Sequence, residues 1–283
     1  MNKSKSGTLV IYTCIFGDGY FLPKVSFSDS AQYLCFTDQG NLESNGWQII
    51  NSSPILENDL VRSSRVIKIL AHNYLKEFER SIYIDPSVEL IADPEDVWNF
   101  LMGASDSPVY GALFHSYRDS VLQEFEAVFQ QKLDSTQLLE EHLAAYLLTD
   151  PDGLKLKPIW SGMLARKHLD PICIKVMEKW FCHVMRYSRR DQLSLPSILL
   201  EIPEHLKHIQ FKNNNVTDFH RWPNANCSRP PRYYSSVTNQ IIPAMLRAET
   251  EAKEKLIIFA KLKAAIAELD AVISERGDAP GKI

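Results

Sequence analysis

The chain has 283 residues, of which 45% are hydrophobic and 23% are charged. This length allows one large α/β core, or such a core with a helical appendage. The formal net charge of −4 gives no general reason to expect nucleic-acid binding or attraction to an anionic membrane.

The cysteines and the N-terminus bear on the compartment. The five cysteines are odd in number and include no CxxC pair, which favours reduced thiols over a disulfide framework or a zinc site. The polar start runs directly into a strand, which is not the pattern of a signal peptide. No apolar run approaches the roughly 20 residues of a membrane-spanning helix. We therefore expect a cytoplasmic protein without a transmembrane segment.

Strand-like and helix-like patterns alternate along the chain. Apolar runs rich in β-forming residues predict strands at 9–16, 32–36, 47–50, 81–84, 109–114 and 160–166. Helical periodicity predicts helices at 59–74, 94–102, 120–133, 136–148, 172–187, 191–200 and 245–273. This alternation predicts an α/β fold with a mostly parallel sheet and helices on both faces.

A change of composition divides the chain near residue 235. Residues 216–234 are rich in Asn, Pro, Arg and aromatic residues, which suggests a long ordered loop or cover. We expect one domain at 7–235 and a helical extension at 236–283. A heptad-like stripe in the extension is compatible with packing on its own domain, which two heptads favour, or with a homodimer coiled coil. The stripe consists of Phe259, Leu262, Ile266, Leu269 and Ile273.

Ligands of open α/β sheets bind beyond the carboxyl ends of the strands, so polar residues there are candidates. Phe16, Gly17 and Asp18 follow the first predicted strand, and Asp38 follows the second. The glycine lets a ligand approach the backbone, and Asp18 can accept a hydrogen bond from a ribose or base. A tight turn explains the same residues equally well.

The helix predicted at 59–74 carries a stripe of cations. Arg62, Arg65 and Lys68 are spaced by three, and His72 follows four residues later. Such a face can neutralise a diphosphate, because arginine and lysine both bind phosphate oxygens. An ordinary solvated helix face is the alternative, and the shortage of acidic partners leaves the two readings even.

Asp85 ends the strand predicted at 81–84 and precedes Pro86. A carboxylate at this point can hold Mn²⁺ or Mg²⁺ and thereby bridge the phosphates of a sugar nucleotide. Capping of a turn is the alternative. His220, in the aromatic and arginine-rich segment, is the tentative second metal ligand.

Three further groups of polar residues follow later strands and helices. His115, Arg118 and Asp119 can grip sugar hydroxyls or start a helix. Trp160 beside Gly162 suits a sugar-binding wall or core packing. Asp191 can act on the acceptor hydroxyl as a general base, while the spacing from Ser188 also fits a helix capping box. Arg190 and Gln192 flank Asp191 on the same sugar and acceptor side.

Seven blocks in a fixed order carry a family resemblance. They are YTCIFGD (12–18), CFTD (35–38), RxxRxxKxxxH (62–72), IYID (82–85), HxxRD (115–119), GMLARKH (162–168) and SRRDQLS (188–194). The chain resembles a bacterial and plant glycosyltransferase-like family, long described as a domain of unknown function and related to the GT-A enzymes. The resemblance implies a GT-A-like fold.

The resemblance also implies a site. Asp85 stands where GT-A enzymes carry the first carboxylate of a DxD motif, although Ser87 replaces the second, which puts metal dependence in doubt. Asp191 belongs to the acceptor-side catalytic face. A UDP- or GDP-sugar donor would lie under the N-terminal half of the chain. The donor-binding residues implied are Thr13, Phe16, Gly17, Asp18, Asp38, Arg62, Arg65, Lys68 and His72.

These expectations describe a hexosyltransferase that acts on a hydroxyl of a glycan or glycolipid. By analogy, it would serve surface polysaccharide or lipopolysaccharide assembly from the cytosolic side of the inner membrane. Two alternatives remain open. One is a metal-assisted hydrolase of a phosphate or amide bond, and the other is a non-catalytic module that binds nucleotide sugars or glycans.

Overall fold

The computed structural model describes residues 9–26, 29–103, 108–211, 213, 217–222 and 252–268. The chain divides into two compact units, 1–235 and 236–283. In the second unit, residues 252–268 form a helix that carries Phe259, Leu262 and Ile266 of the apolar stripe. Leu269 and Ile273, the other two residues of that stripe, lie outside the described residues.

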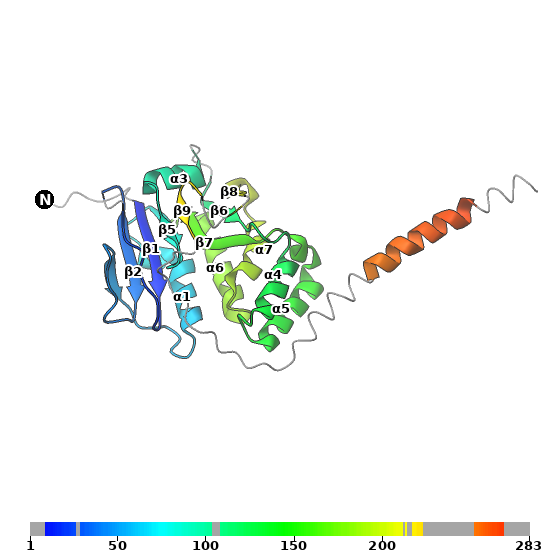
Figure 1. Ribbon diagram of the computed structural model, residues 1–283, viewed down its shortest axis with the longest axis horizontal. Coiled ribbons are helices and arrows are strands. Elements are labelled where there is room, and N and C mark those ends of the chain that lie inside the picture. Colours follow the sequence, from blue (N-terminus) through cyan, green and yellow to red (C-terminus); the bar gives the residue numbers. More distant parts are fainter. Residues whose placement is uncertain are drawn as a thin grey trace, which may run out of the picture. The chain divides into compact units, whose positions relative to one another are not determined.

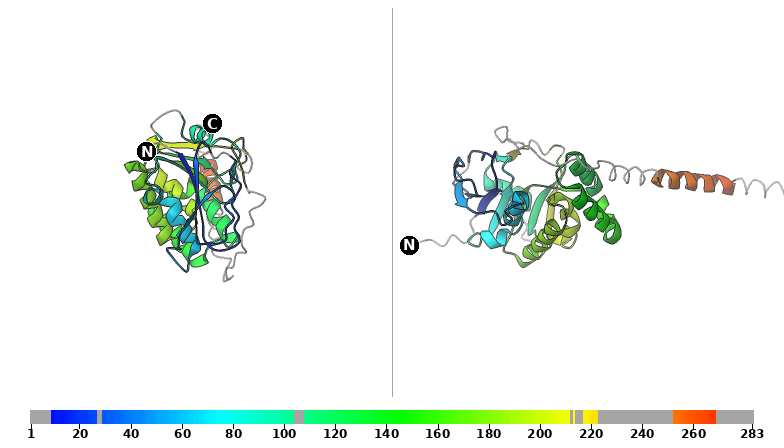
Figure 2. Two further views of the ribbon diagram at one scale, coloured as in Figure 1. Left: turned by 90° about the vertical axis from the view of Figure 1, so that its left-hand side faces the viewer. Right: turned by 90° about the horizontal axis from the view of Figure 1, so that it is seen from below.

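The first unit is built on one mixed sheet. The strands of this sheet are β1 (Leu9–Ile15), β2 (Gln32–Thr37), β3 (Gln48–Asn51), β4 (Arg80–Ile84), β6 (Tyr110–Phe114), β7 (Ile159–Arg166) and β8 (Leu206–Ile209). Among the described residues, their order is β3-β2-β1-β4-β7-β6-β8. All neighbours pair in parallel except β7, which is antiparallel to β4 and β6. The N-terminal strands thus lie toward one edge and β6 and β8 toward the other (Figures 1 and 2).

Two short strands and one sheet strand were not predicted. β5 (Glu89–Leu90) pairs antiparallel with β9 (His220–Arg221), which fastens the 217–222 segment to the chain after β4. β8 extends the main sheet beside β6. Elements of two to four residues are too short to show a hydrophobic period, so only their pairing partners identify them.

Helices occupy the segments with helical periodicity. The α-helices of the first unit are α1 (Leu60–Ile69), α2 (Ala71–Tyr74), α3 (Pro94–Met102), α4 (Val121–Gln130), α5 (Thr136–Thr149), α6 (Pro171–Arg186) and α7 (Leu195–Leu199). The 3₁₀ turns are η1 (Pro151–Lys155), η2 (Asp191–Leu193) and η3 (Pro203–His205).

Two of the predicted helices differ from the structure. The helix predicted at 59–74 breaks between α1 and α2, because Leu70 has ψ 46°, outside the helical region. The helix predicted at 191–200 is η2 followed by α7. Pro196 lies in the first turn of α7, where its missing N–H costs no hydrogen bond, whereas a continuous helix would place it in the interior.

Helices cover both faces of the sheet, as expected. Helices α1 and α6 pack on one face, and α3 packs on the other (Figure 1). Successive side chains of a strand point to opposite faces. In β1, Val10 and Tyr12 accordingly join the core beneath α1 and α6, whereas Leu9 and Ile11 join the core beneath α3. This double burial explains why β1 is apolar throughout.

A β-bulge interrupts the pairing of β6 with β7. Ala112 pairs with Leu164, but the next residue, Leu113, pairs with Trp160. Residues 161–163 of β7 are therefore extra on that side. Bulges redirect side chains and are frequent near functional sites. The bulge here contains Ser161, whose hydroxyl takes part in the polar cluster described next.

Candidate functional site

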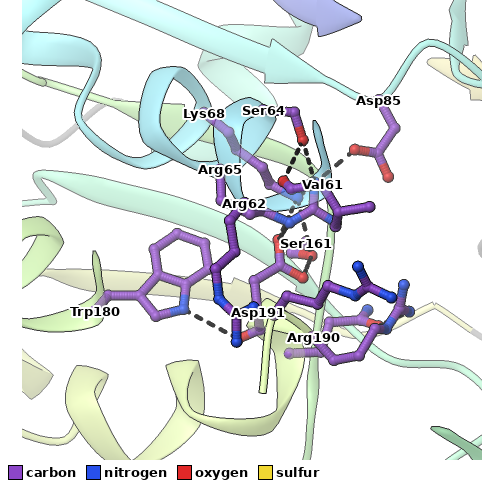
Figure 3. A network of polar contacts seen from close by, with 12 residues as sticks. Val61, Arg62, Ser64, Arg65, Lys68, Asp85, Ser161, Trp180, Arg190 and Asp191 are labelled. Atoms are coloured by element: carbon purple, nitrogen blue, oxygen red, sulfur yellow. Dashed lines mark hydrogen bonds and ion pairs between the residues drawn. The ribbon is translucent and has the colours of Figure 1, made fainter. Parts of the chain in front are cut away.

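Charged and polar side chains from four separate segments meet at one edge of the sheet (Figure 3). Arg65 and Lys68 come from α1, Asp85 follows β4, Ser161 lies in the β7 bulge, and Asp191 opens η2. We call these five residues the central ion-pair cluster. The carboxyl end of β4 lies here, which is where open α/β sheets bind ligands.

Asp191 is the anion at the centre of the cluster. Its Oδ2 lies 2.6 Å from Lys68 Nζ and 3.1 Å from Arg65 Nε, and its Oδ1 accepts from Ser161 Oγ at 3.1 Å. The residue is 1% exposed. Burial alone would raise the pKa of this carboxyl, but the surrounding cations outweigh burial and hold it well below its usual range. Asp191 is therefore ionised and fully engaged by neighbouring side chains.

Lys68 is a fully buried cation, with 0% of its surface exposed. Besides Asp191, its Nζ contacts Ser161 Oγ at 3.2 Å and lies 3.6 Å from Asp85 Oδ1. Its backbone carbonyl accepts hydrogen bonds from the Arg166 guanidinium, at 2.6 Å, and from the Tyr12 hydroxyl, at 2.8 Å. The end of α1 is thus fixed to the sheet, and the ammonium has one position.

Arg65 lies one helical turn earlier and is 13% exposed. Burial opposes the charge of its guanidinium, but Asp191 more than offsets burial, so the pKa of Arg65 lies above its usual value. Asp191 engages Nε, and Nη1 makes only a long contact of 3.3 Å with Ser64 Oγ. The partners of this guanidinium among the described residues thus leave it with hydrogen-bonding capacity beyond its pair with Asp191.

Asp85 is the more exposed of the two carboxylates, with 32% of its side chain open to solvent. Its Oδ1 accepts from the Tyr83 hydroxyl at 2.7 Å. Its backbone N–H donates to the Gly162 carbonyl at 2.9 Å, which extends the β4–β7 ladder into the bulge. A side chain at Gly162 would meet the Trp160 ring at 2.5 Å, so glycine is required for this approach.

His220, the tentative second metal ligand, is otherwise engaged, because its buried ring stacks on Trp160 with its Nδ1 2.9 Å from Thr217 Oγ1. Ser87, at the position of the second DxD carboxylate, accepts a hydrogen bond from Trp222 Nε1 at 3.1 Å. Within the described ranges, no three His, Cys, Asp or Glu side chains gather as a metal site.

One carboxylate together with substrate phosphates can suffice for Mg²⁺. Here, however, the Lys68 ammonium already accompanies Asp85. The described residues therefore do not fit a preformed divalent-cation site, and the cation remains a prediction.

The loop after β1 contacts the loop after β2. Asp38 Oδ1 accepts from the Gly17 N–H at 2.9 Å, and Gly17 has φ +80°, a left-handed conformation that favours glycine. Asp18 is exposed, whereas Phe16 and Thr13 are buried at the end of β1. Gly17 thus has the conformation of a tight turn, and Asp18 lies exposed beside it.

Two of the predicted cations lie elsewhere. Arg62 donates to the carbonyls of Val184, at 3.1 Å, and Tyr187, at 2.6 Å, and so ties α1 to the end of α6. His72 lies 3.7 Å from Glu178, also on α6, and burial lowers its pKa. The structure does not bring either side chain into the central ion-pair cluster.

The predicted sugar-binding residues divide into two groups. Arg118 pairs with the buried Glu124 at 2.8 Å and contacts His115 Nε2 at 2.8 Å. Burial, reinforced by Arg118, lowers the pKa of His115 to about 4. Asp119 instead lies at the surface, 84% exposed, where it pairs with Lys157 at 2.7 Å.

The remaining predicted residues surround Asp191 and Trp160. Gln192 is buried and donates to the Ile159 carbonyl at 3.2 Å, and the Trp160 ring is buried. Arg190 is only partly exposed and makes one long contact, 3.4 Å, with Gln192 Oε1. Electrostatically, Arg190 interacts with Glu124 and with Asp191, and therefore links the sugar-side group to the central ion-pair cluster.

The predicted capping box is wrong. Ser188 Oγ accepts from the Arg190 N–H at 3.1 Å and donates to Asp134 Oδ2 at 2.6 Å. The Asp191 carboxylate is engaged elsewhere, because its Oδ2 binds the two cations of α1 and its Oδ1 accepts from Ser161.

Two contributors were not predicted as site residues. Tyr83 and Ser161 each contact a charged residue of the site. The two-residue period of a strand places Tyr83 on the same face as Asp85, so the strand pattern contained that signal. Ser161 is aimed by the bulge, an effect that is not visible in a local pattern.

In the described part of the chain, no helix is both long enough and apolar enough to cross a membrane. A search of the curated proteins found no match. Among solved structures, the chain is similar to mouse xyloside xylosyltransferase 1 in its apo form, with 12% identity and a TM-score of 0.41 over 72% of this chain and 85% of that chain.

A second solved structure is a glycosyltransferase involved in glycosylation of the major capsid of PBCV-1. Its identity is 11% and its TM-score 0.38, over 72% of this chain and 82% of that chain. Residues 37–222 match the sequence pattern of a described family, and this range contains the whole central ion-pair cluster. The chain therefore belongs to the TOD1/MUCI70 glycosyltransferase-like domain family.

Proposed function

We propose that this protein transfers a sugar from a nucleoside-diphosphate donor to a hydroxyl acceptor. The observation that carries the proposal is the convergence of Lys68 with Asp85 and Asp191, at 3.6 and 2.6 Å, in a glycosyltransferase-like domain. The hydroxyl of the cluster, that of Ser161, is buried and hydrogen-bonded to Lys68 and Asp191. The cluster contains fixed charges, which suit a reaction whose main difficulty is a departing diphosphate.

In this proposal the nucleotide lies over the loops after β1 and β2. The exposed carboxylates of Asp18 and Asp38 are the acceptors for ribose or base donors there. The diphosphate then extends toward Arg65 on α1. Preorganised cations stabilise a developing negative charge without reorganisation at the moment of reaction, and Arg65 is held in place by Asp191.

Asp191 is assigned a positioning role. A general base needs a pKa near the working pH and hydrogen-bond reach to the acceptor hydroxyl. The pKa of Asp191 lies well below its usual range, and both of its oxygens already bind the protein. Asp85, which is partly exposed, is the carboxylate available to a sugar hydroxyl.

The sugar itself is assigned to the volume between Asp85 and the Arg118–Glu124 pair. Arg118 is 20% exposed, and His115 beside it is neutral at physiological pH because its pKa is about 4. A neutral imidazole and a guanidinium are suitable partners for sugar hydroxyls. Arg190 and Gln192 border the same volume from η2 and the residue before it.

The cellular context remains a proposal by analogy. The donor would be a UDP- or GDP-hexose, and the acceptor a glycan or glycolipid in surface polysaccharide or lipopolysaccharide assembly. The protein would work in the cytoplasm at the inner membrane face. The apolar stripe on the helix at 252–268 supports pairing with a second copy, which light scattering of the full chain against a variant with Phe259 and Leu262 both changed to Ser would test.

The central test is donor turnover. The protein is incubated with UDP- and GDP-hexoses, with and without Mn²⁺, and release of UDP or GDP is measured. We expect release that falls by at least tenfold in Asp85→Asn and is unchanged in Asp119→Asn, whose carboxylate lies at the surface. Hydrolysis of a phosphate or amide substrate without any release would favour the hydrolase, and donor binding without turnover would favour the binding module.

A further inference from the structure

The charges around the central ion-pair cluster do not balance. Each of three cations has a carboxylate within ion-pair distance: Arg65 and Lys68 share Asp191, and Arg118 pairs with Glu124. Asp85 adds a third carboxylate beside Lys68. Arg190 is the fourth cation, so four positive side chains face three negative ones. The excess positive charge is that of Arg190, because each of the other three cations has a carboxylate within ion-pair distance.

Arg190 is half-buried and has few contacts for an arginine in that position. Its Nη2 lies 3.4 Å from Gln192 Oε1, a long contact, and its buried Nε has no hydrogen-bond partner among the described residues. In the described part of the chain, no carboxylate forms an ion pair with it. Leaving a buried donor without a partner is unfavourable, so an anion that accepted a hydrogen bond from this guanidinium would be bound more tightly.

The electrostatic environment agrees with this geometry. Burial lowers the pKa of the Arg190 guanidinium, while Glu124 and Asp191 act in the opposite direction. An arginine still carries its charge under these conditions, because its reference pKa is far above neutrality. A ligand with negative charge would therefore relieve the burial cost that the neighbouring carboxylates do not offset.

The shape of the guanidinium selects the kind of anion. Its planar fork matches the oxygens of a phosphate in two parallel hydrogen bonds. Arg65, whose Nε is held by Asp191, presents a second fork to the same cluster. Two arginines directed at one region suit a diphosphate better than a single carboxylate.

We infer that Arg190 binds the phosphate groups of the donor, and that Arg190 and Arg65 neutralise the diphosphate without a divalent cation. This inference rests on the proposed function for the identity of the donor. It departs from the metal-dependent expectation because Ser87 is bound to Trp222 and Asp85 already has the Lys68 ammonium beside it. In this inference, the guanidinium groups of Arg190 and Arg65 supply the positive charge that a metal ion would otherwise bring.

The test is binding of inorganic pyrophosphate to the full chain, measured by titration calorimetry in excess EDTA. We expect measurable binding by the unaltered protein, at least tenfold weaker binding by Arg190→Met, and an intermediate value for Arg190→Lys, which keeps the charge but loses the fork. Arg186→Met is the matched control. It removes the same charge from an exposed arginine that pairs with Glu141, and its affinity should stay within twofold.

Each outcome decides the matter. Unchanged affinity in Arg190→Met, or binding that disappears in EDTA and returns with Mn²⁺, would overturn the inference. Circular dichroism of each variant separates lost binding from lost folding, and if Arg190→Met does not fold, Arg190→Lys provides the comparison. Pyrophosphate binding as expected without turnover of any donor would keep the role of Arg190 and reject sugar transfer.

Discussion

Two arginines one turn apart on α1 have different surroundings. Arg62 donates to two backbone carbonyls on and after α6 and pairs with Asp59, the residue that caps α1, at 2.6 Å. Arg65 pairs with Asp191, which is buried beside the exposed Asp85. The residue type, the helix and the spacing are the same. The partner decides whether the arginine ties α1 to α6 or joins the central ion-pair cluster.

An open cavity of about 650 Å³ lies at the Arg62 end of α1, lined by Ile55, Asp59 and Leu138 among others. Asp59 is engaged within the protein, since it caps α1 and pairs with Arg62 and Arg189. The charged groups of this cavity that have these partners hold the fold together, in contrast to the central ion-pair cluster.

The largest effect on stability is expected from removal of Asp191, the anion of the central ion-pair cluster. Asp191→Ala should lower the free energy of unfolding by about 3–5 kcal/mol, because it leaves two buried cations without their partner. Urea unfolding followed by fluorescence measures this. Asp119→Ala is the control, since its pair with Lys157 is exposed and should contribute about 0–1 kcal/mol. Equal losses in the two variants would contradict the buried pairing.

A second pair of variants tests whether Arg62 and Arg65 have different roles on α1. Arg62→Met should cost about 1–3 kcal/mol of stability, because the carbonyls of Val184 and Tyr187 lose a charged donor. Its affinity for pyrophosphate should stay within twofold of the unaltered protein, whereas Arg65→Met should bind pyrophosphate at least fivefold more weakly. Urea unfolding and calorimetry measure the two effects. Weakened pyrophosphate binding in Arg62→Met to the same degree would show that α1 is not divided in this way.

The last prediction concerns the pH dependence of stability, and it involves a histidine near the Arg62 end of α1. His142 is buried and stacks on Tyr187, whose carbonyl receives Arg62, and burial lowers its pKa to about 3. Between pH 6.5 and 3 the unfolded chain binds this proton and the folded protein does not. The associated stability is therefore present above pH 6.5 and is lost as the pH falls, by about 1.4 kcal/mol per pH unit.

His142→Phe should remove this contribution and keep the ring stacking. We expect the slope of unfolding free energy against pH, measured by urea titration between pH 4 and 6, to decrease by about 1.4 kcal/mol per unit. Above pH 7 the two proteins should show parallel slopes. An unchanged slope between pH 4 and 6 would mean that His142 is protonated in the folded protein.

Most of the regular elements of the first unit could be predicted from local pattern. The run at 9–16 is apolar because β1 is buried on both faces, and the helix at 94–102 begins with an Asp-Pro start signal that the structure also has. Two predicted helix boundaries were wrong, because Leu70 and Pro196 interrupt helices that the hydrophobic periodicity predicted to be continuous. The two-residue strands β5 and β9 and the four-residue strand β8 were missed, because their pairing partners define them.

The order of residues along the chain shows which polar residues follow the strands, and it was enough to predict that Asp85, Arg65, Lys68 and Asp191 belong to one region. Their partners become known only once the chain is folded: Asp191 is buried beside two cations from α1, Arg62 and His72 turn to α6, and in the described part of the chain Arg190 has no carboxylate within ion-pair distance. These ion pairs form between residues distant in the chain, and their strength depends on burial and distance. Neither quantity exists before the sheet brings the segments together.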